Sequence, residues 1–548
     1  MRAFLLALAL LFPAACRPEA APALTEWLAA RYAEQQFDLG AAEDFYRRAL
    51  EADPGNLMVQ GHLLRIRVAA GDAEASLALA RRMDASLTTD GPGGGKALDK
   101  ALVAVRLAMD DMRQGNWRAA AGRLETPGSR ALPEAVRLLG LAWVRHAAGD
   151  ASGVEEALSR AEKTRGARGW AMLHRALLLQ ASGRMDEAGR AFERFRETGF
   201  GARGVLADAA FRAAAGDAAA ARQQLQRYRL MSGQPHVEEP DGLQPLVSTP
   251  LEGVAEVLFG MADALNRRRV PVALLYARLA AMLDPGHGAA VLLAGDILAD
   301  RDRFDEAVAT YRSVPAGSIL RPTAEAKRAR AYASLDRFED AVAVLEAEAK
   351  ARPEDPFPLG ELGHLLRSEE RYEDAAGAYD RAIARIGEKA EARHWRLYYG
   401  RGIAFERTRR WSRAEPDFLK ALEFVPNQAY VLNYLGYSWV DRGERYERAE
   451  EMLAKAVGLR PRDGYIADSL GWVYFRTGRY DEAVGELERA AALEPLDPVV
   501  NEHLGDAYWK TGRRIEARFQ WRRALEFDPD PERIDGLRQR LDCGLDCG

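Results

Sequence analysis

Apolar and small residues recur along the chain at helical spacing, and short polar turns interrupt them. Near the C-terminus, Ala483, Leu487 and Ala490 follow one another at steps of four and three residues, which places them on one face of a helix. Gly478 precedes this segment and Pro495 follows it, as expected for residues that open a turn and stop a helix. The pattern predicts a chain of paired amphipathic helices with almost no strand.

The same pattern returns every 34 residues. Prolines and alanines that keep this period stand at Pro461, Pro495 and Pro529 and at Ala456, Ala490 and Ala524. Further second-helix segments lie at 413–426, 372–383, 338–353, 304–315, 271–285 and 41–54, with weaker copies at 115–125, 183–195 and 216–228. A fixed period of this length is typical of repeat proteins whose units stack in a row.

Each recurring position in the repeat has a physical reason. Small residues such as Gly471 and Ala483 allow two helices to approach closely, and large ones such as Tyr474 and Leu487 fill the space between repeats. Gly478 stands in the turn, where a positive φ favours glycine. With these positions in phase, the chain resembles tetratricopeptide repeat (TPR) proteins, whose units are helix–turn–helix pairs. The resemblance implies an all-α solenoid, a right-handed superhelix of about 13 to 14 repeats.

Irregular segments divide the predicted repeats. Residues 88–97 are rich in glycine, but neither Ser nor Thr follows Lys96 and no strand pattern precedes it, so a phosphate-binding loop is not expected. Residues 232–250 contain four prolines and no helical period. The predicted organisation is a signal peptide, a degenerate N-terminal block, a linker, a C-terminal block and a tail, at 1–15, 16–231, 232–250, 251–531 and 532–548.

The first residues have the layout of a secretory signal peptide. Arg2 is followed by ten apolar residues and then by small residues that end at Cys16. This arrangement resembles a bacterial lipoprotein signal, which implies acylation of Cys16 and an outer-membrane location on the periplasmic side. The alternative is ordinary cleavage, after Ala15 or within 19–23, which would give a soluble periplasmic protein.

Composition and charge change this picture little. A formal net charge of −5 on 548 residues gives no reason to expect nucleic acid or an acidic membrane surface as a partner. Apart from Cys16, the cysteines are Cys543 and Cys547, four positions apart in the tail. They could form a small local disulfide or remain idle thiols, and they are too few for a metal site.

Catalytic and cofactor motifs are not found. The eight histidines include no pair at metal-binding spacing, and no nucleophile elbow is present. Acidic residues fall within the repeat pattern, on faces expected to be solvated. The sequence therefore predicts a protein that is not an enzyme and that has no cofactor and no metal.

Binding is what a TPR solenoid implies. In the family, positions 2, 5, 9, 12 and 13 of each first helix line the concave surface, and aromatic residues there suit a protein interface. By that register the predicted partner-binding residues are Tyr399, Tyr430, Asn433, Tyr437, Tyr465, Asp468, Trp472, Phe475, Arg476, Glu502, Asp506 and Trp509. Packing between helices is the alternative role for the aromatic residues among them. No repeat combines the lysine and asparagine of the clamp that binds cytosolic chaperones.

The last three repeats allow a narrower comparison. They are similar to the C-terminal repeats of large proteobacterial TPR lipoproteins, one of which is the adaptor for a periplasmic carboxy-terminal processing protease. This resemblance implies a scaffold that recruits a protease to peptidoglycan hydrolases. The alternative is a structural part of an envelope assembly or of a polysaccharide or protein export complex.

Overall fold

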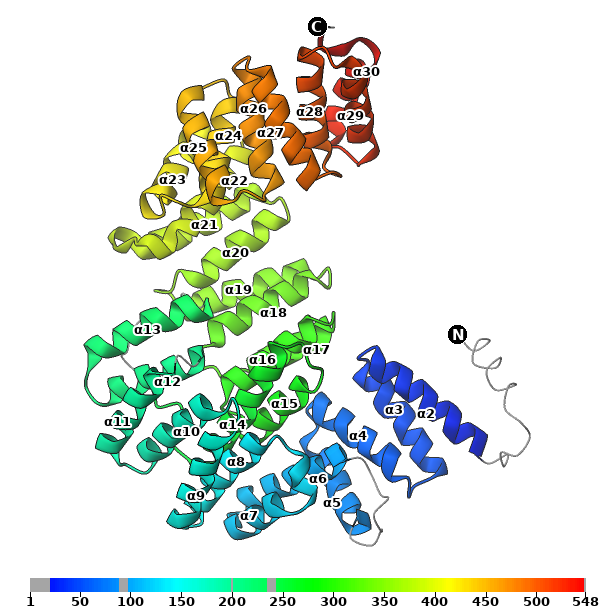
Figure 1. Ribbon diagram of the computed structural model, residues 1–548, viewed down its shortest axis with the longest axis vertical. Helices are drawn as coiled ribbons and strands as arrows, with labels where there is room; N and C mark the ends of the chain where they lie inside the picture. Colours follow the sequence, from blue (N-terminus) through cyan, green and yellow to red (C-terminus); the bar gives the residue numbers. More distant parts are fainter. Residues whose placement is uncertain (1–19, 88–96, 199–200, 234–242, 547–548) are drawn as a thin grey trace. The chain divides into compact units, whose positions relative to one another are not determined.

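The computed structural model describes residues 20–87, 97–198, 201–233 and 243–546. These residues form helices joined by turns, with no strand among them (Figure 1). The all-α solenoid of repeats predicted from the sequence is confirmed. Of the described helices, none is both long enough and apolar enough to cross a membrane.

By its internal contacts the chain divides into two compact units, Met1–Glu348 and Ala349–Gly548. The helices of the first unit are α2 (Ala20–Gln35), α3 (Leu39–Ala52), α4 (Leu57–Ala70), α5 (Ala73–Leu87), α6 (Ala97–Arg113), α7 (Trp117–Glu125), η1 (Gly128–Ala131), α8 (Glu134–Ala147), α9 (Ala151–Lys163), α10 (Arg168–Ala181), α11 (Met185–Arg196), α12 (Ala202–Ala214), α13 (Ala218–Ser232), α14 (Pro250–Asn266), α15 (Ala273–Leu283), α16 (Gly288–Ala299), α17 (Phe304–Arg312) and α18 (Arg321–Ala333). Helix α19 (Phe338–Ala351) includes the boundary.

The helices of the second unit are α20 (Phe357–Ser368), α21 (Tyr372–Ile386), η2 (Gly387–Lys389), η3 (Ala392–His394), α22 (Trp395–Arg407), α23 (Trp411–Phe424), α24 (Ala429–Asp441), α25 (Tyr446–Leu459), α26 (Gly464–Arg476), α27 (Tyr480–Leu493), α28 (Pro498–Lys510), α29 (Arg514–Glu526), α30 (Pro531–Cys543) and η4 (Gly544–Asp546). The even-numbered α-helices from α20 to α28 are the first helices of their pairs, and the odd-numbered ones are the second helices.

The predicted turn and packing roles are confirmed in α26 and α27. Gly478 has a φ of 80°, the left-handed conformation that ends the first helix. A Cβ on Gly471 would lie 2.6 Å from Leu487 Cγ, so only glycine allows this approach of the two helices. Ala483 and Leu487 are fully buried. In other pairs the left-handed position is not a glycine; Glu370, for example, has a φ of 58°.

The first unit does not stack its helix pairs in simple chain order. Helix α14 packs against α8 and α10, and α15 packs against α4 and α6, so this pair returns onto first helices of much earlier pairs. This return joins the repeats on both sides of the predicted linker into one unit. The division by contacts falls after Glu348, outside the predicted linker at 232–250.

Several predicted features of the termini and loops lie outside the described residues. They are the signal peptide, Cys16, most of the glycine-rich loop, residues 234–242 of the linker, and Cys547. The predicted tail at 532–548 differs from the structure, because most of it is the helix α30, whose Leu537 is fully buried. Cys543 at the end of this helix is disulfide-bonded, which excludes an idle thiol at that position.

Candidate functional site

The predicted partner-binding residues lie on the first helices of four successive pairs in the second unit. We call the surface formed by these positions on α22, α24, α26 and α28 the A-helix face. Side-chain caps set where the helices begin: Gln428 accepts from Tyr430 N at 3.1 Å, Asp463 from Ile466 N at 3.2 Å, and Asp497 from Val499 N at 2.9 Å. Because the start fixes the register, it also fixes which side chains point away from the second helices.

Two tyrosines at the same position of neighbouring repeats are the most open aromatic residues of this face. Tyr430 is 42% exposed and Tyr465 is 53% exposed. Both stand in the first turn of their helix, and the guanidinium of Arg460 lies 5.2 Å from the centre of the Tyr430 ring. Large exposed aromatic rings beside a cation are typical of protein interfaces.

A stack of rings occupies the middle of the face. The Trp472 ring lies 3.9 Å from the imidazole of His503, with an angle of 13° between their planes, and 4.8 Å from the Phe475 ring. Trp472 and Phe475 are half-buried, and Trp472 Nε1 is buried without a hydrogen-bond partner. Arg476 at the end of the helix is exposed and donates to the Tyr446 hydroxyl at 3.3 Å.

His503 links α28 to α26 through a buried ion pair. Its Nδ1 lies 3.0 Å from each carboxylate oxygen of Asp468. Burial disfavours the charged imidazolium, but the charge and hydrogen bond of Asp468 outweigh it and raise the pKa of His503 above its ordinary value. His503 is not among the predicted site residues, because it does not stand at one of the family's concave positions.

Asn433, Tyr437 and Tyr399 are half-buried. Asn433 Oδ1 is buried without a hydrogen-bond partner. Burial, reinforced by the negative charge of Asp468, raises the pKa of Tyr437. Tyr399 lies in an aromatic cluster, with ring centres 5.9 Å from Trp395 and 6.0 Å from Tyr434, and burial raises its pKa to about 12. Packing accounts for Tyr399, whereas nothing within the described residues satisfies Asn433 Oδ1.

The structure corrects the prediction that the acidic residues of this face are open to a partner. Asp468, Glu502 and Asp506 are 6%, 4% and 2% exposed, because each pairs with a neighbouring element. Arg540 on α30 donates to Glu502 at 2.8 Å and lies 3.2 Å from Asp506, and Arg533 lies 3.2 Å from Glu502.

Helix α30 therefore covers the last repeat in the way that a further first helix would. Burial raises the pKa of Asp506 to about 6, and the positive charge of Arg540 opposes that rise. We call α30 the C-terminal cap. The sequence contains a pattern that indicates this helix, because Arg533, Leu537 and Arg540 follow one another at helical spacing.

Trp509 is likewise buried. It is 7% exposed, its ring centre lies 5.4 Å from that of Trp521, and the guanidinium of Arg514 lies 4.8 Å from the ring. Of its two predicted roles, packing describes its surroundings. The exposed residues of the A-helix face are therefore Tyr430, Tyr465 and Arg476, and its half-buried residues are Tyr399, Asn433, Tyr437, Trp472 and Phe475. Partner binding by these residues stays a prediction.

Among the described residues, no group of three or more His, Cys, Asp or Glu side chains is arranged to hold a metal ion.

Family models and solved structures relate the chain to known repeats. A model described as "TPR repeat" matches residues 471–512, and one described as "Tetratricopeptide repeat" matches 263–319, 326–391 and 361–429. No curated protein matches the chain.

Solved structures with similarity to the chain include the TPR protein YrrB, described as having an unusual peptide-binding site, with 22% identity, coverage of 36% of this chain and 97% of that one, and a TM-score of 0.29. A tetratricopeptide repeat protein from Parabacteroides merdae has 16% identity, coverage of 46% and 98%, and a TM-score of 0.37. The APC/C hetero-tetramer Cut9–Hcn1 has 14% identity, coverage of 96% and 97%, and a TM-score of 0.40.

The family-model matches, together with the helix pairs and their glycine-dependent packing, establish that the chain carries tetratricopeptide repeats in the matched segments. Such repeats indicate a scaffold for protein–protein interaction.

Proposed function

We propose that the chain is a non-enzymatic scaffold or adaptor of the bacterial cell envelope that binds partner proteins on the A-helix face. The observation that carries this proposal is the pair Tyr430 and Tyr465, which are exposed at equivalent positions of successive repeats. On the same face, Trp472 is half-buried, and Arg476, at the end of the same helix, is exposed. Aromatic residues with interleaved polar groups are the usual centre of a protein interface.

The envelope location rests on the sequence of the first 16 residues. A signal peptide would export the chain, and acylation of Cys16 would attach it to the periplasmic side of the outer membrane. Incorporation of labelled palmitate in the wild type, and its loss in Cys16→Ser, would support the anchor. Export without label in the wild type would leave a soluble periplasmic protein.

A finer form of the proposal names the partners. The similarity of the last three repeats to adaptor lipoproteins supports recruitment of a carboxy-terminal processing protease and of the peptidoglycan hydrolases that it cleaves. Burial of Asp468, Glu502 and Asp506 means that such recruitment would depend on aromatic contacts more than on acidic ones.

Site-specific photo-crosslinking tests the proposal in living cells. A photoreactive phenylalanine replaces Tyr465 in one variant and Ile515 in a control, since Ile515 is 84% exposed on the second helix α29. We expect envelope proteins to crosslink at position 465 and not at position 515. A protease or a cell-wall hydrolase among them would support the finer form. Components of one assembly, with neither of these, would favour a structural role. Identical products at both positions would contradict binding on the A-helix face.

A further inference from the structure

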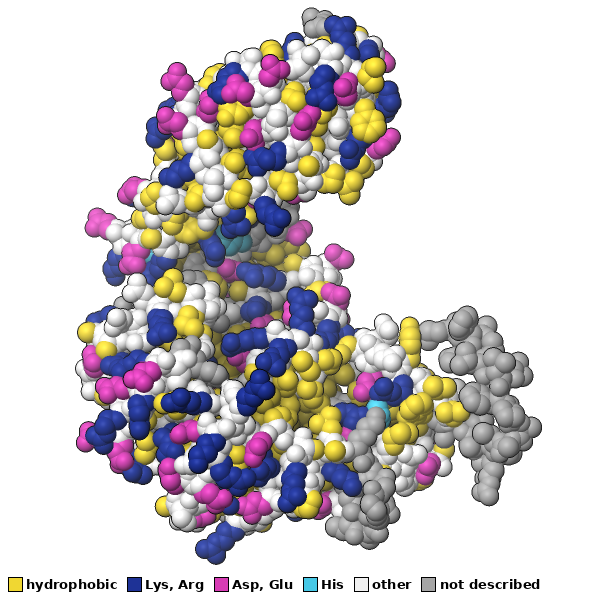
Figure 2. All heavy atoms as spheres, viewed as in Figure 1, with side chains coloured by type: hydrophobic (Ala, Val, Ile, Leu, Met, Phe, Trp, Pro, Cys, Tyr) yellow, Lys and Arg dark blue, Asp and Glu magenta, His cyan; other side chains and the backbone are white. Residues whose placement is uncertain are grey.

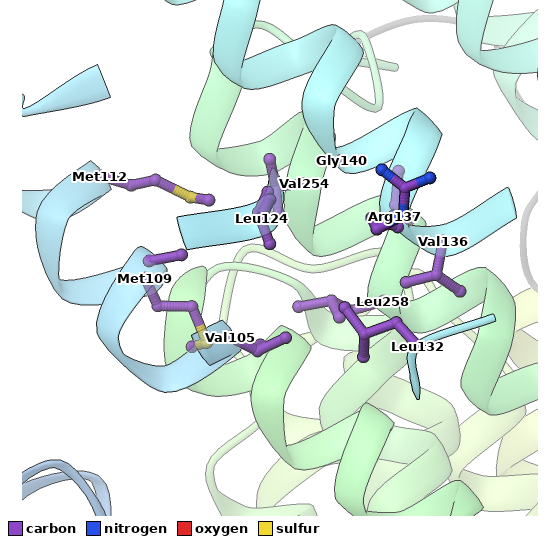
Figure 3. A pocket seen from close by; sticks show the side chains of 12 residues that line it. Val105, Met109, Met112, Leu124, Leu132, Val136, Arg137, Gly140, Val254 and Leu258 are labelled. Atoms are coloured by element: carbon purple, nitrogen blue, oxygen red, sulfur yellow. The ribbon is translucent and has the colours of Figure 1, made fainter. Parts of the chain in front are cut away.

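In the first unit, helix α14 packs against the first helices of earlier pairs and covers the surface that these helices form. Gly260 of α14 lies against Trp170 of α10, where an added Cβ would stand 2.8 Å from the indole nitrogen. Val254 and Leu258, from the same helix, meet Met109 of α6 and Val136 of α8 around an apolar cavity of only about 20 Å³ (Figure 3). Such a space is too small and too apolar to hold a ligand. The middle of this surface is therefore closed by packing.

Where this filling ends, a groove of about 620 Å³ remains open. Residues of α2 and α4, the turn after α2 and Leu98 at the start of α6 form one wall, and residues at the start of α15 and Arg301 in the turn after α16 form the other. We call it the seam groove, because its two walls come from segments that are far apart in the sequence. Its lining includes Phe37, Leu39, Ile66, Leu98, Leu274 and Leu275. On the visible side of the first unit, apolar and basic side chains gather together near α15 and α16 (Figure 2).

Polar contacts hold the two walls together. Arg278 of α15 donates from Nε to the carbonyl of Ala69 at 3.1 Å and from Nη2 to Thr310 Oγ1 at 2.9 Å. Arg303 lies 3.6 Å from Asp38. The groove is thus a built feature of one compact unit, with a size in the range of ligand-binding clefts.

The charges that line the groove are not balanced. Arg31 pairs with Glu34 at 2.6 Å, and Arg65 pairs with the buried Asp99. Arg301 also lines the groove, with its guanidinium 4.5 Å from the centre of the Phe37 ring and Nη1 donating to the Ile297 carbonyl at 3.0 Å. In the described part of the chain, no carboxylate lies within ion-pair distance of Arg301. One guanidinium therefore faces an apolar groove without a counter-charge.

We propose that the seam groove binds a peptide segment that carries one aspartate or glutamate beside large apolar side chains. The carboxylate would pair with Arg301, whose guanidinium is already oriented by the Phe37 ring and the Ile297 carbonyl. The apolar side chains would cover Leu98, Leu274 and Leu275, which removes apolar surface from water. This site is distinct from the A-helix face and lies in the other unit, so the two proposals can fail separately.

The test is selection from a phage library of random dodecapeptides on the full chain, followed by affinity measurement on the enriched peptide. We expect a consensus with one acidic residue next to two or more large apolar ones. A synthetic peptide and its amide counterpart, with Asn or Gln for the acid, are then compared by fluorescence anisotropy. On the wild type, the amide peptide should bind about tenfold more weakly or worse, because a charge-assisted pair is lost.

Matched variants connect the binding to the groove. In Arg301→Gln the two peptides should bind within about twofold of each other, whereas Arg268→Gln, which removes an exposed arginine in the turn after α14, should keep the full difference. Leu98→Ser should weaken both peptides, and Met185→Ser should not, although the two side chains are similarly exposed at 38% and 37%.

The proposal would be overturned by the lack of an enriched consensus, by a consensus without an acid, or by a preference for the acid that survives in Arg301→Gln. A peptide whose binding depends on Tyr465 and not on Arg301 would also overturn it, while leaving the A-helix face proposal standing.

Discussion

His503 Nδ1 lies 3.0 Å from both carboxylate oxygens of Asp468, so a charged hydrogen bond ties α28 to α26 across the boundary between two repeats. The Trp472 ring stacks on the same imidazole, with centres 3.9 Å apart. Other charged and titratable groups around His503 are Glu502, Asp506 and Arg533, and Tyr437 adjoins Asp468. The aspartate that the repeat register assigned to a partner thus serves to hold the next repeat in place.

Removing that carboxylate is expected to lower the pKa of His503. In Asp468→Asn, burial acts on the imidazole without the opposing charge, so its pKa should fall from above the ordinary value to below it. Histidine-selective NMR over pH 4 to 9, with His503→Gln to assign the resonance, measures the change. In the wild type, the stabilisation from this pair should be complete below about pH 6.5 and be lost as pH rises through the raised pKa. An unchanged midpoint in Asp468→Asn would show that the carboxylate does not control the charge.

Arg540→Leu is expected to destabilise the C-terminal cap. The change leaves Glu502 and Asp506, which are nearly fully buried, without their closest cation. Breaking a buried ion pair from one side costs roughly 3 kcal/mol, and Arg533 would offset part of that loss at Glu502. Urea unfolding followed by tryptophan fluorescence gives the difference. The control Arg538→Leu alters a 69% exposed side chain on the same helix and should change stability by less than about 0.5 kcal/mol. Equal effects of the two variants would argue against the cap.

Replacing Gly253 with alanine should loosen the return of α14 onto α8. A Cβ at this position would overlap the Trp143 indole, which is fully buried and has little room to move. We expect a loss of about 1 to 3 kcal/mol, as for other overpacked cores. Gly122→Ala in α7 makes the same chemical change in a helix where nothing lies within 4 Å, and it should stabilise by roughly 0.5 to 1 kcal/mol. Thermal unfolding and the rate of limited proteolysis distinguish the opposite signs, and the same sign for both would contradict the packing.

The first unit should lose stability in mild acid through His174. This side chain is fully buried and accepts a hydrogen bond from Trp143 Nε1 at 3.0 Å, and burial lowers its pKa to about 4. Because the unfolded imidazole takes up its proton near pH 6.5, acidification from there toward pH 4 favours the unfolded state, by an amount on the order of 1 to 3 kcal/mol. Urea unfolding at pH 4.5 and pH 7 measures this difference. His174→Gln keeps an acceptor for Trp143 and does not titrate, so its pH dependence should be weaker; an identical slope would exclude His174 as the cause.

A left-handed turn that lacks glycine offers a gain in stability. Arg409 has a φ of 60° between α22 and α23, a conformation that costs a residue with a Cβ roughly 1 kcal/mol. Arg409→Gly should therefore raise the unfolding midpoint, whereas Gly478→Ala, at a φ of 80° between α26 and α27, should lower it by a similar amount. Calorimetry on both variants tests the pair, and a lower midpoint for Arg409→Gly would mean that its side chain contributes more than the strain costs.

Much of the fold could be predicted because the repeat depends on local rules. The 34-residue spacing of Ala456, Ala490 and Ala524 marks positions that are fully buried, since helical spacing and small size together require a close helix contact. Helix starts and turns follow from side-chain caps such as Asp463 and from glycines such as Gly478, which act within a few residues. The helix pairs and their packing positions were therefore readable without a structure.

The candidate site was predicted only in part. The register of the repeats predicted that Tyr430 and Tyr465 lie on an accessible surface. It could not show that the carboxylates of Asp468, Glu502 and Asp506 would be buried in ion pairs with residues of the next helices. It also assigned residues 532–548 to a tail, although Leu537 anchors a helix there. The terminal helix α30 has no repeated copy in the sequence by which it could be recognised. Its role is visible only in its contacts, such as the one between Arg540 and Glu502, which lie 38 positions apart.

The sequence by itself determined that this protein is an all-α array of helix pairs, because capping, turn geometry and helical periodicity are properties of short stretches of chain. Only the tertiary structure decided which faces of that array stay open. Arg278 meets Ala69 across 209 positions, and the return of α14 and α15 that makes this contact closes one surface and leaves the seam groove beside it. Such contacts depend on where the chain turns back through space, and no periodicity in the sequence encodes that path.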